Sequence, residues 1–339
     1  MSDLELVPVD PTTDDELLGR WVEAQTAVSE HAFGDRHTAY SLAEVRTQLR
    51  LTTDYAVELV AAVRDGVVVG AGRVDLPLRD NPTVAAIRMG VRPEHRRQGI
   101  GAALLAELES RALAAGRRTL ISESEVAVGG TEPATTFAPA HGYTAALHEL
   151  RSDLDLPDDL DAMLVPLEAD AQAHSAGYEL LTWWDGVPAE WLTQRAELST
   201  RMSTDAPFGD LDIEEERWDE ERVAQQGRIA REQGRRLVET VALETATGRL
   251  VAFTLLAVAE HTPQLAYQWD TLVLREHRGH RLGQLVKAAN LRALLAGLPQ
   301  VRRVVTWNAG VNEPMLRVNR AMGFEVVGSM TEWQKQLPD

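Results

Sequence analysis

The pattern of apolar and polar positions follows the same order in both halves of the chain. In the first half, alternating or continuous apolar runs predict strands over 4–7, 58–64, 67–76, 83–91, 119–126 and 143–154. Apolar residues at helical spacing predict helices over 13–30, 41–50, 100–115 and 133–141. Asp65-Gly66, between the second and third strands, is a strong hairpin signal. A hairpin followed by alternating strands and helices predicts a mixed sheet flanked by helices.

The second half repeats this order. Its predicted strands cover 178–184, 236–244, 250–260, 265–274, 301–308 and 324–333. Its predicted helices lie near 188–202, 214–233, 283–296 and 313–322. The segment 155–177 is rich in Asp, Pro and Ala and breaks the periodicity, although 160–174 could form a short helix. We therefore predict two α/β domains, one over 1–156 and one over 177–339, joined by a linker over 157–176.

One signature, a strand that leads into a glycine loop and a helix, occurs once in each half. The first copy reads MGVRPEHRRQGIG from Met89 to Gly101, and the second reads TLVLREHRGHRLG from Thr271 to Gly283. The two copies are separated by a constant offset of 182 residues. A pattern of this length at one offset indicates two versions of the same domain.

The loop in this signature has the chemistry of a phosphate-binding site. Its glycines let the backbone approach an anion closely, and the first N–H groups of the following helix point toward that anion. Four arginines add positive charge: Arg96, Arg97, Arg278 and Arg281. The loop follows the fourth strand of each half, whereas a dinucleotide-binding loop follows the first. The Gly-x-Gly-x-x-Gly and Walker forms are both absent.

The order of elements and the Arg-x-x-Gly-x-Gly loop resemble the GNAT superfamily of N-acetyltransferases, whose signature is Arg/Gln-x-x-Gly-x-Gly/Ala after the fourth strand. The resemblance covers nearly the whole chain, once per half. Each half also closes with a helix that ends in Gly-aromatic, at Gly142-Tyr143 and at Gly323-Phe324. The run TWNAGVN at 306–312 is similar to tandem GNAT proteins of actinobacterial type, of which mycothiol synthase is the best known.

This resemblance implies two tandem GNAT folds, each with a mostly antiparallel sheet whose fourth strand splays from the fifth. In the family, the loop binds the pyrophosphate of acetyl-CoA and the pantetheine arm lies between the splayed strands. The cofactor-binding residues implied by the match are Val91, Arg96, Arg97, Gln98, Gly99, Ile100, Gly101, Ala102, Leu272, Val273, Arg278, Gly279, His280, Arg281, Leu282, Gly283, Asn308 and Asn312. Acetyl-CoA is then a cosubstrate, and no metal is expected.

The two copies differ in ways that bear on which half is catalytic. The second has Arg281 where the first has a glycine, which makes its loop the poorer match. However, it carries Asn308 and Asn312 where the family usually has an asparagine that contacts the cofactor. The resemblance places Asn319 at the position of the family's tyrosine, which can protonate the departing thiolate. The first half has Ala138 at that position, so neither half keeps the tyrosine.

Direct transfer to an amine needs a group that accepts the amine's proton, since free amines have pKa values of ~10. Asp270 lies on the strand before the second loop, whereas the first half has Arg88 there. Asp270 is therefore our first candidate for a base or substrate anchor, and a structural ion pair is an equally good interpretation. Backbone N–H groups near Val273 or Val91 would bind the carbonyl oxygen.

Asp205 is the second acidic candidate, because it lies between two predicted helices that line the acceptor pocket in the family. Its alternative role is a helix cap. Trp218 and Trp269 flank the proposed pocket and are candidates for contact with a cationic or apolar acceptor. We expect the second half to be catalytic and the first to be a second acetyl-CoA site or a scaffold.

The composition narrows the class of partner. The net charge is −18, with 34 basic and 52 acidic residues, which disfavours nucleic acid. Nine of the acids lie between Asp205 and Glu221, which is typical of a solvated helix face; alternatively, they attract a cationic substrate. The chain has no cysteine, no apolar run long enough for a membrane span and no secretion signal near Met1, so we expect a cytoplasmic protein.

The leading hypothesis is an acetyl-CoA-dependent N-acetyltransferase that acts on a primary amine of a small, cationic molecule. One alternative is a CoA-binding sensor or scaffold without turnover, which the missing tyrosine favours. Another alternative is acetylation of a lysine in a protein or peptide. Two fused domains can supply the contact that single-domain relatives obtain by dimerising, so we expect a monomer or a homodimer.

Overall fold

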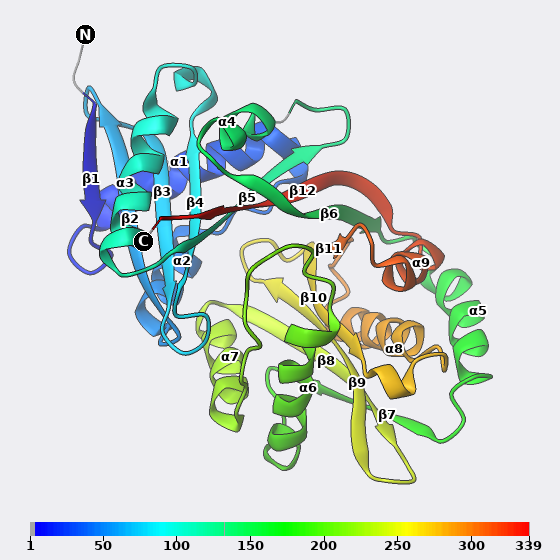
Figure 1. Ribbon diagram of the computed structural model, residues 1–339. Helices are drawn as coiled ribbons and strands as arrows, with labels where there is room; N and C mark the ends of the chain where they lie inside the picture. Colours follow the sequence, from blue (N-terminus) through cyan, green and yellow to red (C-terminus); the bar gives the residue numbers. More distant parts are fainter. Residues whose placement is uncertain (1–3, 132, 339) are drawn as a thin grey trace. The chain divides into compact units, whose positions relative to one another are not determined.

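The computed structural model describes residues 4–131 and 133–338 (Figure 1). The chain forms two compact units, and the strands of each unit are neighbours in the strand order; we call these strands the sheet of that unit. The first unit comprises Met1–His148, Gly209–Glu214 and Gly328–Asp339, and the second comprises Glu149–Phe208 and Glu215–Val327. Both sheets are mostly antiparallel and flanked by helices, which confirms the predicted fold class.

The sheet of the first unit runs in the order β1-β2-β3-β4-β5-β12. Its strands are β1 (Glu5–Val9), β2 (Tyr55–Arg64), β3 (Val67–Pro77), β4 (Val84–Val91), β5 (Thr119–Ala127) and the end of β12 (Glu325–Gln336). Its helices are α1 (Asp15–Phe33), α2 (Leu42–Leu51), α3 (Ile100–Ala114) and α4 (Ala134–Ala140). The β4–β5 pair is parallel, and the β1–β2, β2–β3, β3–β4 and β5–β12 pairs are antiparallel.

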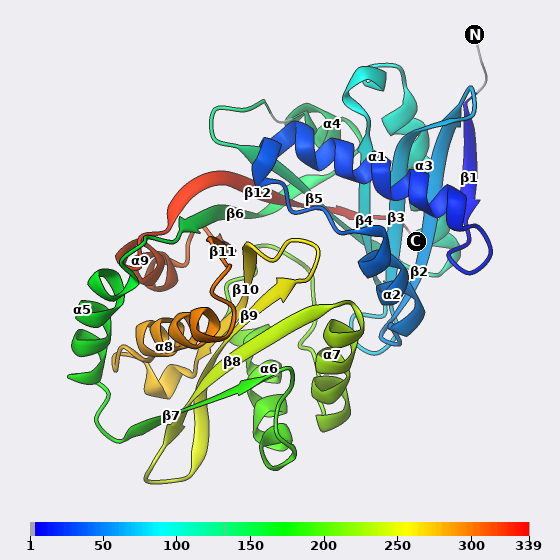
Figure 2. The same cartoon turned by 180° about the vertical axis from the view of Figure 1, so that it is seen from behind.

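Two apolar clusters cover the faces of this sheet. On one face, Leu104 and Leu108 of α3 pack against Val74 and Ile87 (Figure 1). On the other face, α1 and α2 cover the strands, and α1 contributes Trp21 (Figure 2). Since successive residues of a strand point to opposite faces, alternating apolar residues of β2 and β3 serve both clusters.

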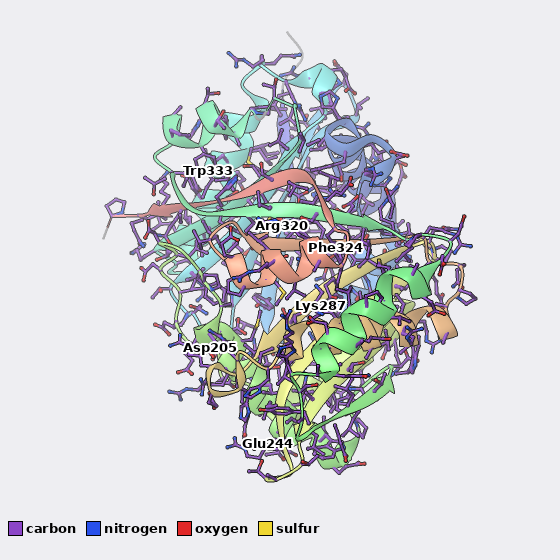
Figure 3. The ribbon with its side chains drawn as sticks, turned by 90° about the vertical axis from the view of Figure 1, so that its right-hand side faces the viewer. Asp205, Glu244, Lys287, Arg320, Phe324 and Trp333 are labelled. Carbon is purple, nitrogen blue, oxygen red and sulfur yellow. The ribbon has the colours of Figure 1, made fainter. Side chains whose placement is uncertain are left out.

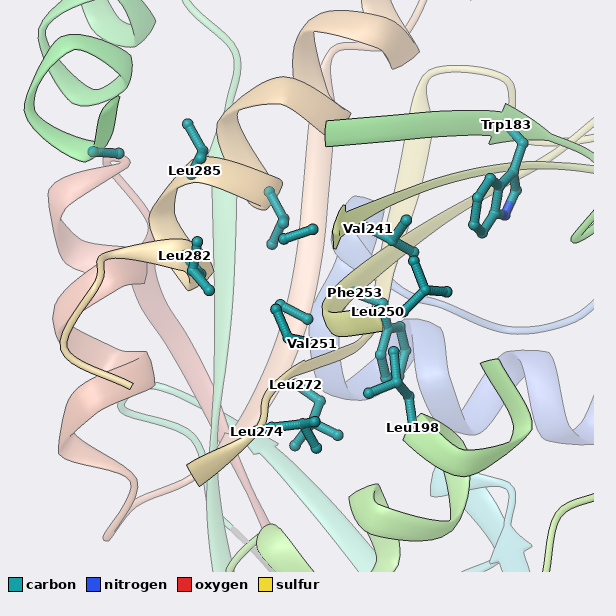
Figure 4. Packing of buried hydrophobic residues seen from close by; sticks show 14 residues of the cluster. Trp183, Leu198, Val241, Leu250, Val251, Phe253, Leu272, Leu274, Leu282 and Leu285 are labelled. Carbon is teal, nitrogen blue, oxygen red and sulfur yellow. The ribbon is translucent and has the colours of Figure 1, made fainter. Parts of the chain in front are cut away.

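The sheet of the second unit runs in the order β6-β11-β10-β9-β8-β7. Its strands are the end of β6 (Thr144–Asp155), β7 (Tyr178–Trp184), β8 (Arg235–Glu244), β9 (Arg249–Ala259), β10 (Leu265–Val273) and β11 (Arg303–Ala309). Its helices are α5 (Leu160–Gln172), α6 (Leu192–Asp205), α7 (Glu220–Glu232), α8 (Leu282–Gly297) and α9 (Glu313–Ala321). Leu282 and Leu285 of α8 share a buried cluster with Phe253 of β9 and Leu198 of α6 (Figure 4).

Each sheet is completed by the last strand of the other half of the sequence. Residues 328–336 of β12 pair antiparallel with β5 in the first unit. Residues 149–155 of β6 pair antiparallel with β11 in the second. The units therefore differ from the halves 1–156 and 177–339 at these strands, and the predicted domain boundaries stay a prediction. Most of the predicted linker forms α5, which packs on α8.

Two sequence-based element predictions need correction. The helix predicted from residue 214 begins only at Glu220, because Asp219 caps it by accepting a hydrogen bond from the Arg222 N–H. The acids before Asp219 are therefore not a helix face. Strand β1 continues through Pro8 to Val9, since an edge strand tolerates a residue without an N–H donor.

Candidate active site

The fourth strand of the second unit, β10, contains a bulge at the centre of the candidate site. Between Gln268 and Thr271 the register against β9 shifts, so that Trp269 and Asp270 together oppose Leu255. A bulge of this kind bends the strand and re-aims its side chains. The corresponding part of β4 pairs with β3 without interruption, so the bulge distinguishes the second unit from the first.

Buried polar side chains hold the backbone around this bulge. The Gln268 side-chain amide donates to the Leu255 carbonyl at 2.9 Å and to the Thr254 hydroxyl at 3.0 Å. Asn290 of α8 donates to the Thr254 carbonyl at 3.4 Å. At the offset of 182 residues, the positions equivalent to Gln268, Thr254 and Asn290 in the first half hold residues without a polar side chain. These residues are Ala86, Gly72 and Leu108, respectively. The second half therefore encodes a support for the bulge that the first half lacks.

The strands β10 and β11 pair in parallel only from Leu265 to Tyr267, and beyond that point they splay. The Leu274 N–H donates to the Val251 carbonyl at 3.0 Å, toward β9. Because successive N–H groups of a strand point to opposite sides, the Val273 N–H faces the splayed side. In the first unit, Arg92 donates to β3 in the same way, so the Val91 N–H also faces away from its antiparallel neighbour.

Asp270 lies in the bulge and is exposed to solvent. The protein atoms packed around it nevertheless raise the pKa of its carboxyl by desolvation. The positive charge of Arg195 opposes this rise, and the negative charge of Glu216 adds to it. Arg195 itself donates to Glu239 at 2.6 Å and to the Ser199 hydroxyl. Asp270 forms no hydrogen bond or ion pair with any described residue, so its carboxylate is available to a ligand.

The first unit has an ion-pair network where the second has this carboxylate. Arg88 occupies the equivalent position and contacts Asp75 at 2.7 Å and Glu123 at 2.9 Å. Asp75 also binds Arg73 at 2.6 Å. These neighbouring carboxylates raise the pKa of the Arg88 guanidinium, so this position is a cation at any physiological pH. A positive, fully paired group cannot accept the proton of an amine.

The two glycine loops have the same backbone conformation. Arg97 and Gly99 have φ angles of 62° and 80°, and the equivalent Gly279 and Arg281 have 87° and 54°. Each loop therefore places one glycine and one arginine at two left-handed positions, with the order reversed. The prediction that Arg281 makes the second loop poorer has no basis in backbone shape, because the first loop holds Arg97 in the same strained region.

Both loops leave the first turn of their helix open to an anion. The N-cap residues of α3 and α8 make no side-chain capping bond, whereas Asp or Ser or Asn side chains cap α1, α2, α5, α7 and α9. Arg96 and Arg278 brace the two loops alike, with Nε donating to the carbonyl of Val91 at 3.1 Å and of Val273 at 3.2 Å. The helix N–H groups are thus positioned for phosphate oxygens.

Comparison with known proteins identifies the fold and the family. The Acetyltransferase (GNAT) family matches residues 22–143. The structure of a tandem GNAT protein from the clavulanic acid biosynthesis pathway, without acetyl-CoA, is 30% identical in sequence, covers 99% of both chains and superposes with a TM-score of 0.80. The chain belongs to the GNAT acetyltransferase family. It is therefore an acyltransferase of a family that uses acetyl-CoA.

More distant structures share the fold of this GNAT protein. A GCN5-related N-acetyltransferase from Sphaerobacter thermophilus is 17% identical, with a TM-score of 0.69 and coverage of 99% of this chain and 96% of its own. The structure of a putative acetyltransferase from Pyrococcus horikoshii is 13% identical, with a TM-score of 0.57 and coverage of 99% of this chain and 90% of its own. No curated protein matches the sequence.

Asp205, labelled in Figure 3, lies at the end of α6. Arginines surround its carboxylate. Its buried carboxylate contacts Arg201 at 3.3 Å, Arg275 at 3.4 Å and Arg278 at 3.7 Å. Because Asp205 ends a helix, it does not serve as the N-cap considered from the sequence. These contacts connect α6 to the second glycine loop of the GNAT fold, and a catalytic role for Asp205 stays a prediction.

The three asparagines of the second half have different environments. Asn319 is buried, accepts a hydrogen bond from Lys287 at 2.8 Å and donates to Asn308 at 2.6 Å. Asn312 is the N-cap of α9 and accepts a hydrogen bond from the Met315 N–H at 3.3 Å. The arrangement joins Asn308 and Asn319 at the splayed part of β11, while Asn312 stabilises the start of a helix.

The two tryptophans proposed as acceptor contacts are related to Asp270 in different ways. Trp269 is its neighbour in the bulge, with the Arg235 guanidinium 5.9 Å from its ring centroid. The indole N–H of Trp218 donates to Glu216 at 2.8 Å, and Glu216 is one of the charges that Asp270 senses. Both side chains are half-buried, and contact with an acceptor stays a prediction.

Sequence reasoning missed Arg195, Glu239, Gln268 and Lys287. None belongs to a motif, but comparison of the two copies holds a signal for two of them. Lys287 stands where the first half has Leu105, and the strand pairing aligns Glu239 with Leu59. A charged residue at a position that is an apolar core residue in the other copy indicates a change of role.

Paired substitutions in the loops test which half holds the nucleotide of acetyl-CoA. A Cβ at Gly101 would lie 3.5 Å from Phe137, and one at Gly283 would lie 3.7 Å from Val273, both ordinary contacts. We expect Gly283→Asp to weaken acetyl-CoA binding roughly tenfold or more, since a carboxylate there repels phosphate. Gly283→Asn, with the same size and no charge, should cost less.

Calorimetric binding of acetyl-CoA to the wild type and to the variants, including Gly101→Asp and Gly101→Asn, measures the effect on each loop. Equal losses for the aspartate and asparagine variants at a site would indicate a steric effect rather than charge repulsion there. Loss of turnover on Gly101→Asp alone, with Gly283→Asp harmless, would reverse the assignment of the second half as catalytic.

Two absences concern the described part of the chain. None of its helices is both long and apolar enough to cross a lipid bilayer. In the same residues, no group of three or more His, Cys, Asp or Glu side chains is arranged to hold a metal ion.

Proposed function

We propose that the second unit transfers the acetyl group of acetyl-CoA directly to a primary amine of a small, cationic molecule. The observation that carries this proposal is Asp270, a solvent-exposed carboxylate in the bulge, with a raised pKa and no hydrogen bond or ion pair to any described residue. Three residues along the same strand, the Val273 N–H faces the splayed side. A proton acceptor and an oxyanion donor therefore lie on one strand.

These groups support a direct transfer. The amine binds as an ammonium, loses a proton to Asp270, and its nitrogen attacks the thioester carbonyl carbon. The Val273 N–H stabilises the negative charge that develops on the carbonyl oxygen. The C–S bond then breaks, the nitrogen gives up its second proton to solvent and becomes the amide nitrogen, and CoA leaves as a thiolate that takes up a proton from water. A raised pKa makes Asp270 the stronger base.

The charges and rings around Asp270 favour a cationic acceptor. Glu216 is close enough to raise the pKa of Asp270, and the Trp218 ring is held beside Glu216. An ammonium or second cationic group of the acceptor gains from both a carboxylate and an aromatic face. The net charge of −18 also attracts cations at long range.

The first unit has a complete glycine loop and no base at the Asp270 position, because Arg88 is paired there. We propose that this unit is a second acetyl-CoA site or a scaffold. The similarity to tandem enzymes of the mycothiol synthase type, the cytoplasmic location and a monomeric or homodimeric state stay predictions.

A CoA-binding sensor without turnover is the second candidate. One specific observation favours it: the family's tyrosine position holds Asn319, which donates hydrogen bonds but cannot give up a proton near neutral pH. This candidate predicts acetyl-CoA binding with no release of thiol under any acceptor.

Thiol release from acetyl-CoA, measured with a thiol-reactive dye, separates the two candidates. The protein has no cysteine, so every thiol detected belongs to CoA. We expect release only with an amine present, and a kcat/KM for diamines roughly tenfold or more above that for neutral amines of the same length. Calorimetric binding without release for any amine would support the sensor instead. Faster release with a lysine peptide would reassign the acceptor to a protein.

A further inference from the structure

Lys287 is a buried cation in the interior of the second unit. It lies on α8, one turn beyond Gly283, with 2% of its surface exposed. Its ammonium nitrogen is 2.8 Å from Asn319 Oδ1 and 5.2 Å from the ring centroid of Phe324 (Figure 3). The position in the first half is Leu105, which packs in an apolar cluster. Burying a lysine ammonium costs free energy that its hydrogen bonds must offset.

The contact with Lys287 fixes which way the Asn319 amide points. A lysine ammonium carries only donors, so it must face the oxygen of the amide. The nitrogen of Asn319 then faces Asn308, to which it donates at 2.6 Å. Of the two N–H groups on that nitrogen, one donates to Asn308, and the other has no hydrogen-bond partner within the described part of the chain. Asn308 pairs with Leu150 of β6 and lies beyond Arg303–Val305, the residues of β11 that pair with β10.

We propose that Lys287 is a positioning residue that, through Asn319, aims an amide N–H at the thiolate leaving from acetyl-CoA. This inference rests on the proposed acetyl transfer in the second unit. Lys287 itself does not touch the reacting atoms. The amide stabilises the departing sulfur by a hydrogen bond, and the thiolate takes its proton from water, so no proton passes through Asn319. The pair thus takes over one task of the missing tyrosine.

The protonation state of Lys287 decides whether this orientation is unique. Burial lowers the pKa of Lys287 to about 7, and desolvation is the only cause of that shift. The neutral amine has a lone pair and can accept a hydrogen bond from the Asn319 nitrogen. The amide can then turn over and present its oxygen to Asn308 and its surroundings. The orientation of the Asn319 amide is therefore fixed below about pH 7, and it is no longer unique as the pH rises above that value.

No charged group on the elements packed against α8 contributes to this shift. On α5, Asp170 pairs with Arg281 and Glu168 with Arg292. On α9, Arg320 pairs with Glu313. On β8, Glu239 pairs with Arg195, on β9, Arg249 pairs with Glu197, and on β10, Asp270 senses Arg195 and Glu216. The Lys287 equilibrium is therefore governed by burial alone.

Two substitutions of Lys287 test, through the pH dependence of kcat, whether the protonated lysine orients the Asn319 amide. In the wild type, kcat should rise with pH as Asp270 loses its proton and then fall as Lys287 becomes neutral near pH 7. Lys287→Arg keeps a donor-only cation, so it should retain activity and lose the falling limb. Lys287→Met removes the donor; we expect kcat to drop roughly tenfold, with no falling limb and the KM for acetyl-CoA changed less than about twofold.

A double-mutant cycle tests whether Lys287 acts through Asn319. Asn319→Leu should lower kcat by about as much as Lys287→Met, and the double variant should lose no more than either alone. Thermal unfolding of all variants checks that they fold, and Lys287→Met remains informative if the larger arginine does not fit.

The outcomes separate this inference from the proposed function. A falling limb near pH 7 that persists in Lys287→Met, or additive losses in the cycle, would overturn the positioning role while acetyl transfer stands. An absence of amine-dependent thiol release in the wild type at every pH would overturn the proposed function itself.

Discussion

Replacing Asp270 by asparagine is expected to lower kcat for amine acetylation by about 10²–10⁴-fold, the range for loss of a positioned general base. The change keeps the size of the side chain and removes the proton acceptor. Acetyl-CoA affinity should stay within about twofold, because the phosphate contacts lie on the glycine loop. Steady-state thiol release and calorimetric binding of acetyl-CoA measure the two quantities. Asp35→Asn, at an exposed acid of the first unit, is the control for the change in charge.

The pH dependence gives this prediction a second readout. Desolvation raises the pKa of Asp270, so the carboxyl is protonated and inactive as a base up to a higher pH than an ordinary aspartate. The wild-type rate should therefore rise through that raised pKa, and Asp270→Asn should lack this limb. An unchanged kcat in the variant would exclude Asp270 as the base. A fall in acetyl-CoA affinity equal to the fall in kcat would indicate a role in cofactor binding instead.

The contacts of Asp270 bear on the two interpretations that the sequence leaves open. A structural ion pair requires a cation in contact with the carboxylate. The nearby cation, Arg195, spends its hydrogen bonds on Glu239 and Ser199. Asp270 feels its charge only at longer range. A carboxylate with a raised pKa that forms no hydrogen bond or ion pair with the described residues is expected at a functional position rather than in a structural pair.

The elements of this fold could be predicted from the sequence because their signals are local. The Asp65-Gly66 turn has both residues at positive φ, as a hairpin of this kind requires, and β7 matches its predicted range of 178–184. The exchange of β6 and β12 could not be predicted, since alternation of apolar residues defines the faces of a strand and not its partner. The bulge was equally hidden, because it depends on the pairing of β10 with β9.

The comparison of the two loops also depended on information that a sequence lacks. From the residues alone, Arg281 is an arginine in the place of a glycine. The structure shows that the first loop also has an arginine with a left-handed backbone, Arg97, at the position equivalent to Gly279. The Arg281 guanidinium binds Asp170 of α5 at 2.7 Å, so its charge is directed to the linker helix. What separates the halves is therefore the carboxylate and the bulge, and not the shape of the loops.

Replacing Arg195 by methionine is expected to reduce the free energy of unfolding by ~3–5 kcal/mol, the usual cost of breaking one side of a buried ion pair. Arg195 has 1% of its surface exposed, and its guanidinium lies 3.6 Å from the ring centroid of Phe253. Methionine fills much of the same volume but leaves Glu239 buried without its cation, 2.6 Å from where Nε stood. Urea denaturation of the full chain, followed by far-UV circular dichroism, measures the change.

The sign of the pH dependence distinguishes a stranded charge from simple loss of packing. Burial already raises the pKa of Glu239, and Arg195 opposes that rise. In the variant the folded pKa should rise further, so the native state binds the proton more tightly than the unfolded chain, whose glutamates titrate at ~4.3. The deficit should therefore shrink as the pH is lowered from about 8 to about 5, because protonation neutralises Glu239.

Arg195→Met combined with Glu239→Met removes both charges and should recover much of the lost stability. If the deficit is the same at both pH values and the double variant is no more stable than the single one, the cost comes from packing against Phe253, and the electrostatic account of this pair is wrong.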